Sequence, residues 1–280
     1  MIEIYPDYKE IFKSFKSVDD FLKIDIDIVR DFKNRKTGRF FIDGKGFYIK
    51  KHFECGIGAI LDELFHLRKP HIGAGHERAL LDRLRTIGID TMAVAAFGQD
   101  GKILSTQRSF LVTEELTNVA SLEDICARWR TKPPTTVIKK ALLQKVAEIA
   151  KTLHNSGINH RDFYLCHFLM DTGNLQAAEM GKQPPTLYLM DLHRAQQRNE
   201  VPFRWRVKDI GGLYFSAMDI ELNRTDLFRF MTLYTGKSLR QTLHEDRGFW
   251  KAVRRRAVWT YRRDFGKNPE PRIARMDTKK

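Results

Sequence analysis

Cysteine, long apolar runs and an export signal are scarce or absent in this sequence. The 280-residue chain has three cysteines, Cys55, Cys126 and Cys166, which are widely spaced and odd in number. Such a set predicts no disulfide framework, and because no two cysteines follow CxxC spacing, no structural zinc site is expected. No apolar run approaches the roughly eighteen residues needed to cross a bilayer. The N-terminal MIEIYPDYKE also lacks the basic start and apolar stretch of a secretory signal, so we expect a cytoplasmic protein.

Positive charge is what the sequence has in excess. The formal net charge is +14, while the hydrophobic content of 42% is ordinary for a chain that buries a globular core. Basic proteins accumulate on polyanions, which include nucleic acids, anionic membrane faces, phosphorylated glycolipids and acidic proteins. Net charge alone does not choose among these partners.

The excess charge is concentrated at the C-terminal end. Residues 247–280 hold twelve Lys and Arg against three Asp and Glu, a surplus of nine. Trp250, Trp259, Tyr261 and Phe265 lie among them, a mixture typical of a segment that lies on an anionic interface. The plainer interpretation is a final helix with a solvated basic face and a frayed end. Both interpretations stay open at this point.

Strand-like segments around one helix dominate the first part of the chain, and helices dominate the rest. DGKG at 43–46 predicts a hairpin turn, and Gly88 is a helix stop. Later, Ser121 is typical of a helix N-cap, and Gly157 follows a long amphipathic helix. The expected strands are 27–34, 38–43, 46–53, 91–99, 109–116 and 186–191, and the main helices are 75–88 and 132–157.

The stretch INHRDFYLCHFLMD, residues 158–171, contains the His-Arg-Asp tripeptide of the protein-kinase catalytic loop. In that loop an asparagine five positions after the aspartate holds a metal ion, whereas the fifth position here is His167. The match is compatible with a kinase whose metal site is altered, with a kinase fold that no longer catalyses, or with chance. It gains weight because it follows a capped helix and a glycine turn and precedes a strand.

Lys50 is the candidate for gripping the phosphates of a nucleotide. It lies in FYIKKH, on the strand after the hairpin, where kinases place such a lysine. Because side chains alternate along a strand, Lys51 points to the opposite face, together with Phe47 and Ile49. Glu77, on the following helix, could pair with Lys50 and hold it. The alternatives are two solvent-exposed lysines, and a glutamate favoured in a first helical turn by the helix dipole.

Two aspartates complete the set of charges that phosphoryl transfer needs. Asp162 is the candidate base, which in such a loop accepts the proton of an acceptor hydroxyl. We expect His160 and Arg161 to brace the loop rather than touch substrate. Asp191 ends the strand LYLMD, where a kinase places its magnesium-binding aspartate, although Asp-Phe-Gly reads Asp-Leu-His here. The alternative for Asp191 is an aspartate that caps a turn.

The order of these elements predicts an α+β, two-lobed protein-kinase-like fold. Residues 1–115 would form an N-terminal lobe with an antiparallel sheet of five strands and one main helix. Residues 116–280 would form a mainly helical C-terminal lobe with the basic tail, and residues 114–118 the hinge. No GxGxxG loop precedes Lys50, and no Ala-Pro-Glu segment follows Asp191. Both absences favour a small-molecule or glycan acceptor over a peptide.

The catalytic-loop motif, with MDLHRAQ at 190–196 and RWRVKDIGGLYFSAMDI at 204–220, resembles the lipopolysaccharide core heptose(I) kinase family of Gram-negative bacteria. Segments 71–98 and 110–124 match the same family, and the similarity runs over roughly residues 5–260. The resemblance implies an enzyme that uses ATP and Mg²⁺ to phosphorylate O-4 of the first heptose of the inner core. Its acceptor would be the lipid A–core glycolipid on the cytoplasmic face of the inner membrane.

The resemblance also assigns roles to residues. The family's catalytic aspartate falls on Asp162, its strand lysine on Lys50, its helix glutamate on Glu77 and its metal aspartate on Asp191. The family carries the same Cys-His-Phe sequence, so His167 is the expected residue. We expect it to contact a phosphate, to reach the metal through water or to bind the metal weakly, because Mg²⁺ prefers oxygen ligands.

Two further positions are informative by the same comparison. Asp209, in RWRVKD, lines up with the helix aspartate that braces the catalytic loop in kinase folds. Phe163 is a local departure, since close relatives are expected to have cysteine there, and it should alter packing rather than chemistry.

Two other functions stay open: a kinase for the neighbouring acidic sugar, 3-deoxy-octulosonic acid, and a non-catalytic basic binding protein with a kinase fold. A nucleic-acid-binding protein would explain the net charge but not the ordered Lys50, Glu77, Asp162 and Asp191, so no nucleic acid partner is expected. The predicted partners are the lipid A–core glycolipid and, peripherally, the anionic inner-membrane face. An acidic protein partner is also left open.

Overall fold

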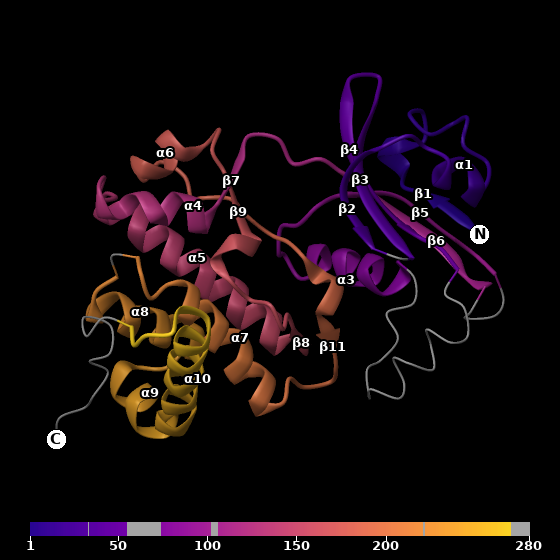
Figure 1. Ribbon diagram of the computed structural model, residues 1–280. Coiled ribbons are helices and arrows are strands. Elements are labelled where there is room, and N and C mark those ends of the chain that lie inside the picture. The colour runs from indigo at the N-terminus through magenta and orange to yellow at the C-terminus, as the bar shows by residue number, and fades with distance from the viewer. Residues whose placement is uncertain (33, 55–73, 102–105, 221, 270–280) are drawn as a thin grey trace. The chain divides into compact units, whose positions relative to one another are not determined.

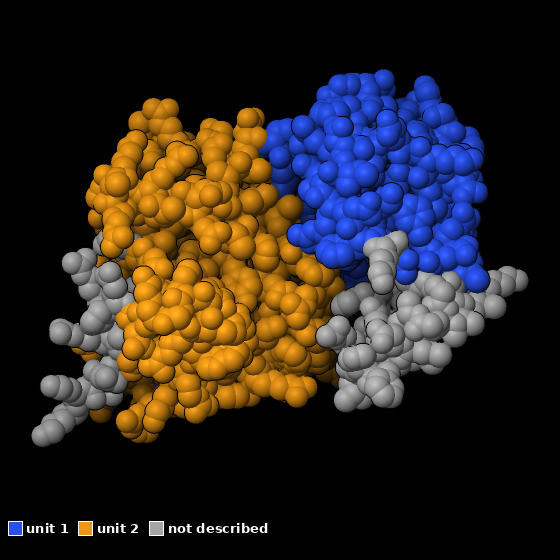
Figure 2. Space-filling model, viewed as in Figure 1, with its two compact units in different colours: residues 1–83, 92–117 blue, residues 84–91, 118–280 orange. Residues whose placement is uncertain are grey.

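The computed structural model of the protein describes residues 1–32, 34–54, 74–101, 106–220 and 222–269 (Figure 1). Cys55 and residues 270–280 of the predicted basic tail lie outside the described residues. The chain divides into two compact units, coloured blue and orange in Figure 2. Unit 1 is residues 1–83 with 92–117, and unit 2 is residues 84–91 with 118–280.

Unit 1 is built on a six-stranded antiparallel sheet in the order β1-β5-β6-β4-β3-β2. The five predicted strands are present, but the predicted number was wrong, because β1 adds a sixth strand beside β5. Three residues are too few to give an alternating pattern that a sequence can reveal. The elements are β1 (Ile2–Ile4), η1 (Pro6–Tyr8), α1 (Val18–Leu22), β2 (Asp27–Phe32), β3 (Arg35–Ile42), β4 (Lys45–His52), α3 (Gly75–Thr86), β5 (Val94–Asp100) and β6 (Arg108–Glu114).

The β3–β4 hairpin decides which side chains of β4 face the core. Its turn places Asp43 and Gly44 at φ angles of 50° and 75°, the left-handed pair that a two-residue hairpin turn requires. With this turn β4 alternates between its two faces, and Phe47, Ile49 and Lys51 are all buried. The hairpin predicted from DGKG is confirmed.

Aromatic side chains fill the core of unit 1. Phe12, Phe21, Phe47 and Phe110 are fully buried. The rings of Phe21 and Phe110 stack with centroids 4.0 Å apart, and Phe12 meets Phe47 edge-on at 5.2 Å. Burying a side chain of this size stabilises the fold by about 1.5–3 kcal/mol. This packing holds one face of β4 inward and leaves Lys50 on the other.

Helices dominate the described part of unit 2, as predicted. The Ser121 side chain accepts the backbone N–H of Asp124 at the start of α4, and the Thr135 side chain caps α5. Gly157, with φ of 76°, follows α5. The helices are α4 (Leu122–Ala127), η3 (Arg128–Arg130), α5 (Thr136–Asn155), η4 (Leu165–His167), α6 (Leu175–Glu179), η5 (Leu192–Arg194), α7 (Phe203–Ser216), α8 (Arg224–Thr235), α9 (Leu239–Glu245) and α10 (Arg247–Phe265).

Two small sheets in unit 2 tie two separate loops together. Strand β9 pairs with β10 and also with β7, and strand β8 pairs with β11, all antiparallel. The loop with His-Arg-Asp runs from β8 to β9, and Asp191 lies between β10 and β11. Both loops are therefore anchored to each other at both ends. The strands are β7 (Val119–Ser121), β8 (Ile158–Asn159), β9 (Phe168–Asp171), β10 (Leu187–Leu189) and β11 (Gln196–Gln197).

The C-terminal helix α10 is partly a core element. It packs along α7, and its buried residues include Trp250 and Tyr261. Only part of the predicted aromatic surface is therefore available, since Trp259 and Phe265 are about half exposed at 50% and 53%. None of the helices among the described residues is both long enough and apolar enough to span a membrane.

Candidate functional site

In unit 1 the structure brings Lys50 and Glu77 together. The Lys50 ammonium donates a hydrogen bond to Oε1 of Glu77, which lies in the first turn of α3 and is nearly buried. Lys51, on the other face of β4, donates to the carbonyl oxygens of Leu22 at 3.0 Å and Ile24 at 2.5 Å. Burial lowers the pKa of Lys51. Lys51 is thus tied to the core, and Lys50 is the lysine that an outside ligand can reach.

In unit 2 the loop with His-Arg-Asp is held by Asp209, a fully buried residue of α7. Its Oδ2 accepts the backbone N–H of His160 at 2.7 Å, and its Oδ1 accepts that of Arg161 at 2.7 Å. His154 on α5 lies 3.2 Å from the same Oδ2. Arg161 has φ of 76°, a left-handed conformation that is costly for a residue with a side chain. The bonds from Asp209 hold that conformation in place.

The next residue, Asp162, carries the carboxylate that this loop presents. Arg194 Nη1 donates to Asp162 Oδ1 at 2.9 Å and to Oδ2 at 3.1 Å. Arg194 lies in η5, three residues after Asp191, and the sequence motifs did not single it out. Only its position just after the strand-end aspartate hinted that it would reach this site. The ion pair orients the Asp162 carboxylate, whose side chain is 15% exposed.

Asp191 and His167 are also brought together. Asp191 adopts φ of 62° and ψ of 57°, a second left-handed non-glycine residue at this site. Its Oδ2 lies 3.5 Å from His167 Nε2, and His193 Nδ1 is hydrogen-bonded to its Oδ1. His167 Nδ1 lies 2.6 Å from the carbonyl oxygen of Asp162. His167 therefore links the segment of Asp162 to the carboxylate of Asp191.

The surroundings of His167 favour its charged form. Burial lowers the pKa of His167, but hydrogen bonds to Cys166 and to the Asp162 carbonyl, with the charges of Cys166 and Asp191, outweigh it and raise the pKa to about 9. An imidazolium has no lone pair to give a metal, and a charged His167 ring would face the Asp191 carboxylate as an ion pair at 3.5 Å.

The donor set suits magnesium better than a transition metal. Among the described residues, no three His, Cys, Asp or Glu side chains converge as a complete metal cage. Mg²⁺ needs no such cage, because it commonly uses one or two carboxylates and completes its shell with water and phosphate oxygens. Asp191, with its side chain 29% exposed, supplies an accessible carboxylate of that kind.

Comparison with known proteins identifies the family. The model of the lipopolysaccharide kinase (Kdo/WaaP) family matches residues 19–234. The chain belongs to this family. The match contains Lys50, Glu77, the catalytic loop, Asp191 and Asp209, and it confirms the resemblance stated from the sequence motifs.

Individual relatives agree with the family match. The lipopolysaccharide core heptose(I) kinase WaaP of Escherichia coli is 38% identical over 259 residues, which cover 92% of this chain and 96% of that protein. WaaP of Pseudomonas aeruginosa is 39% identical over 236 residues, 84% of this chain and 87% of that protein. A solved structure of WaaP in complex with acyl carrier protein superimposes with a TM-score of 0.78 at 33% identity, covering 93% of this chain and 99% of that one. The predicted α+β kinase-like fold is thereby confirmed.

Proposed function

We propose that this protein transfers the γ-phosphate of ATP to O-4 of the first heptose of the lipopolysaccharide inner core. Membership of a kinase family makes the chain a phosphotransferase that acts on an alcohol group. The names of the relatives support heptose as the acceptor sugar. The observation that carries the proposal is the Asp162 carboxylate, presented by a loop that Asp209 holds in a strained conformation.

In this proposal, residues of the protein hold the nucleotide and the acceptor in place and remove the proton of the acceptor hydroxyl. Asp162 orients the heptose hydroxyl and accepts its proton as the bond to phosphorus forms. Arg194 holds the Asp162 carboxylate by its ion pair, and Lys50, oriented by Glu77, binds phosphate oxygens of the nucleotide. Because the contact with Glu77 already restricts the rotamers of Lys50, less side-chain entropy is lost when Lys50 binds the nucleotide.

The Asp191 carboxylate would hold the magnesium ion. A bound magnesium ion neutralises developing charge on the transferred phosphoryl group. We propose that His167 pairs with the Asp191 carboxylate and does not ligate the ion, since its Nδ1 is hydrogen-bonded to the Asp162 carbonyl and its Nε2 lies 3.5 Å from Asp191 Oδ2. This role differs from the three that the sequence left open, which were contact with a phosphate, contact with the metal through water and weak binding of the metal.

Radiolabelled ATP with defined truncated lipopolysaccharides tests the acceptor. We expect label to enter an acceptor that ends in the first heptose and not an acceptor that ends before it. The matched pair differs only in that sugar. Labelling of the heptose-free acceptor would instead assign the enzyme to the neighbouring acidic sugar, 3-deoxy-octulosonic acid.

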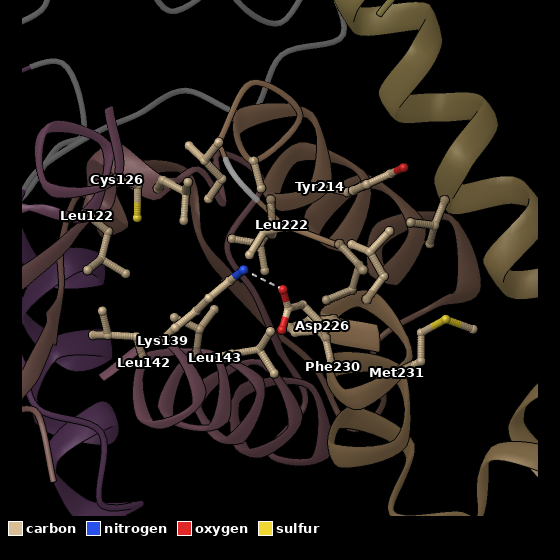
Figure 3. A pocket seen from close by; sticks show the side chains of 18 of the residues that line it. Leu122, Cys126, Lys139, Leu142, Leu143, Tyr214, Leu222, Asp226, Phe230 and Met231 are labelled. Atoms are coloured by element: carbon tan, nitrogen blue, oxygen red, sulfur yellow. Dashed lines mark ion pairs between the residues drawn. The ribbon is translucent and has the colours of Figure 1, made fainter. Parts of the chain in front are cut away.

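An apolar pocket in unit 2 suggests that the protein has a protein partner in addition to its glycolipid acceptor. It lies among α4, α5, α7, α8 and α10, and its cavity volume is about 100 Å³ (Figure 3). Leucine, valine and aromatic side chains line most of it. The ion pair of Lys139 Nζ with Asp226 Oδ2, at 2.6 Å, is its main charged feature, and Arg254 also lines it. A long hydrocarbon chain fits such a lining.

We propose that an acyl carrier protein binds this unit with its acyl chain in the pocket. The solved structure of a relative in complex with acyl carrier protein supports this partner, and an acidic carrier suits a chain with a net charge of +14. A buried chain contributes roughly 0.8 kcal/mol for each CH₂ group, so most of the affinity should come from the acyl group.

Filling the pocket with a larger side chain should remove the preference of the protein for an acylated carrier. Leu143 lines the pocket on α5, whereas Val137 on the same helix is 47% exposed and does not line it. We expect the wild-type protein and Val137→Trp to bind an acylated carrier at least tenfold more tightly than the unacylated carrier in calorimetry. Leu143→Trp should bind both equally weakly. Equal affinities for the two carriers in the wild type would contradict the acyl pocket.

We further propose that the protein contacts the anionic face of the inner membrane peripherally. The exposed side of α10 carries Lys251, Arg255 and Trp259 at helical spacing. Arg256 and Arg263 lie over the Trp259 ring at 4.8 and 5.1 Å. This combination of cations and one amphipathic ring suits anionic headgroups, to which attraction weakens as salt rises.

A further inference from the structure

Four basic side chains surround the Trp205 ring on α7, and we call this group the Trp205 cluster. Arg161 lies 4.9 Å from the ring centroid, Arg204 5.2 Å, Lys208 5.6 Å and Arg198 5.9 Å. One aromatic ring therefore gathers cations from the catalytic loop, from the segment after β11 and from α7 itself. Such crowding of like charges is unfavourable unless an anion balances it.

The nearby carboxylates do not balance the cluster. The Asp162 carboxylate is already in an ion pair with Arg194. Asp209 is buried, and its carboxylate accepts the backbone N–H groups of residues 160 and 161. The Lys208 ammonium makes no hydrogen bond or ion pair with the residues that the structure describes. Burial lowers the pKa of Lys208, and the charges of Arg194 and Arg161 lower it further against the opposing effect of Asp162.

Hydrogen-bond donors at the cluster also lack acceptors. Arg161 Nε, Trp205 Nε1 and Asn159 Nδ2 are buried without a partner among the described residues. Arg198 donates to Asn159 and Gln196, whose side-chain oxygens carry no charge. Buried donors without acceptors are costly. These three donors are enclosed, so it is the charge of the cluster that calls for an anionic ligand.

The cluster lies on the Asp162 side of the site. Arg161, whose guanidinium lies 4.9 Å from the Trp205 ring centroid, directly precedes Asp162 in the chain. The Asp162 charge acts on Lys208 as well. Asp191 belongs to the other loop, between β10 and β11. An anion bound near Lys208 would therefore lie beside the proposed base rather than beside the proposed metal ligand. That is where the acceptor sugar must place its hydroxyl.

We infer that Lys208, with Arg161 beside it, binds the carboxylate of the acidic sugar that neighbours the acceptor heptose. This inference rests on the proposed heptose kinase function and adds residues that recognise the acceptor. A carboxylate fits because it is an anion that accepts several hydrogen bonds in one plane. The contact would fix the distance between the acidic sugar and Asp162, and so select which hydroxyl reaches the base.

The test compares two soluble, deacylated acceptor oligosaccharides that both contain the first heptose. One keeps its carboxylates, and in the other they are reduced to alcohols. Steady-state transfer from ATP is measured for the wild-type full chain, Lys208→Met and the control Lys140→Met, which removes an exposed lysine of α5. Methionine keeps an apolar stem like that of lysine and removes the ammonium, with its charge and its hydrogen-bond donors.

We expect Lys208→Met to raise KM for the carboxylate acceptor about tenfold or more, the effect of losing one charge-assisted hydrogen bond. Its KM for the reduced acceptor should equal that of the wild type, and its KM for ATP should not change. Lys140→Met should match the wild type throughout. An equal rise for both acceptors, a rise in KM for ATP, or no change at all would overturn the inference.

These outcomes separate this inference from the proposed function. If the wild type labels neither acceptor, the heptose kinase function fails, and the carboxylate site fails with it. If the wild type labels both with equal KM, the function stands and the carboxylate site alone is wrong. Unfolding temperatures of the variants exclude misfolding as the cause of any loss.

Discussion

Replacing Asp162 with asparagine is expected to lower the rate of phosphate transfer by a factor of about 10²–10⁴, the usual contribution of a general base. Asparagine keeps the shape of the side chain, and its oxygen can still accept a hydrogen bond from Arg194 Nη1. It cannot take up the proton of the acceptor hydroxyl. Single-turnover transfer of label from ATP to a heptose acceptor measures the loss.

The matched control is Asp171→Asn, at the other end of the same motif. Asp171 accepts the N–H of Gly173 at 2.8 Å and has no proposed part in the reaction. We expect it to retain transfer, and both variants to unfold cooperatively within a few degrees of the wild type. Transfer by Asp162→Asn within tenfold of the wild type would refute Asp162 as the base.

Replacing Lys50 with methionine is expected to lower kcat/KM for ATP by about 10²–10³-fold, the range found when one preorganised electrostatic contact is removed. The Lys50 ammonium on β4 pairs with Glu77. Its side chain is 24% exposed, so a phosphate can reach it. The loss should appear in titrations of ATP at saturating acceptor. Some loss of stability is also expected, because Glu77 is left unpaired.

Lys51→Met provides the control at the adjacent position of β4. This change leaves the carbonyl oxygens of Leu22 and Ile24 without their donor, which costs about 1–3 kcal/mol for a buried group. We expect a lower free energy of unfolding but unchanged kcat/KM of the folded protein. The opposite pattern, with Lys51→Met the more damaging to kcat/KM, would show that the wrong lysine had been assigned to phosphate.

Much of unit 1 could be predicted because its signals are local. The alternation of β4 placed Lys50 and Lys51 on opposite faces, and the structure confirms that division. DGKG predicted its hairpin because Asp43 and Gly44 tolerate the left-handed φ that the turn demands. Strand β1 was missed, because a short edge strand is stabilised by the backbone of β5 and leaves no periodic pattern of its own.

The C-terminal segment was predicted less well. Its charge and aromatic content fitted an interfacial tail or a final helix equally, because composition does not reveal what a helix packs against. In the structure α10 packs along α7 and buries Trp250 and Tyr261, while Trp259 remains half exposed. The final helix is thus part core and part basic surface.

The sequence by itself determined the main helices and five of the six strands of unit 1, several helix caps, the order of the charged motifs and, through resemblance, the family. These follow from turns, caps and periodicity, which depend on residues a few positions apart. Only the tertiary structure decided that Arg194 pairs with Asp162, that His167 bridges to Asp191, and that Lys208 joins the cations around Trp205. Such contacts join segments that are distant in the chain, and their partners are set by how the helices and small sheets pack.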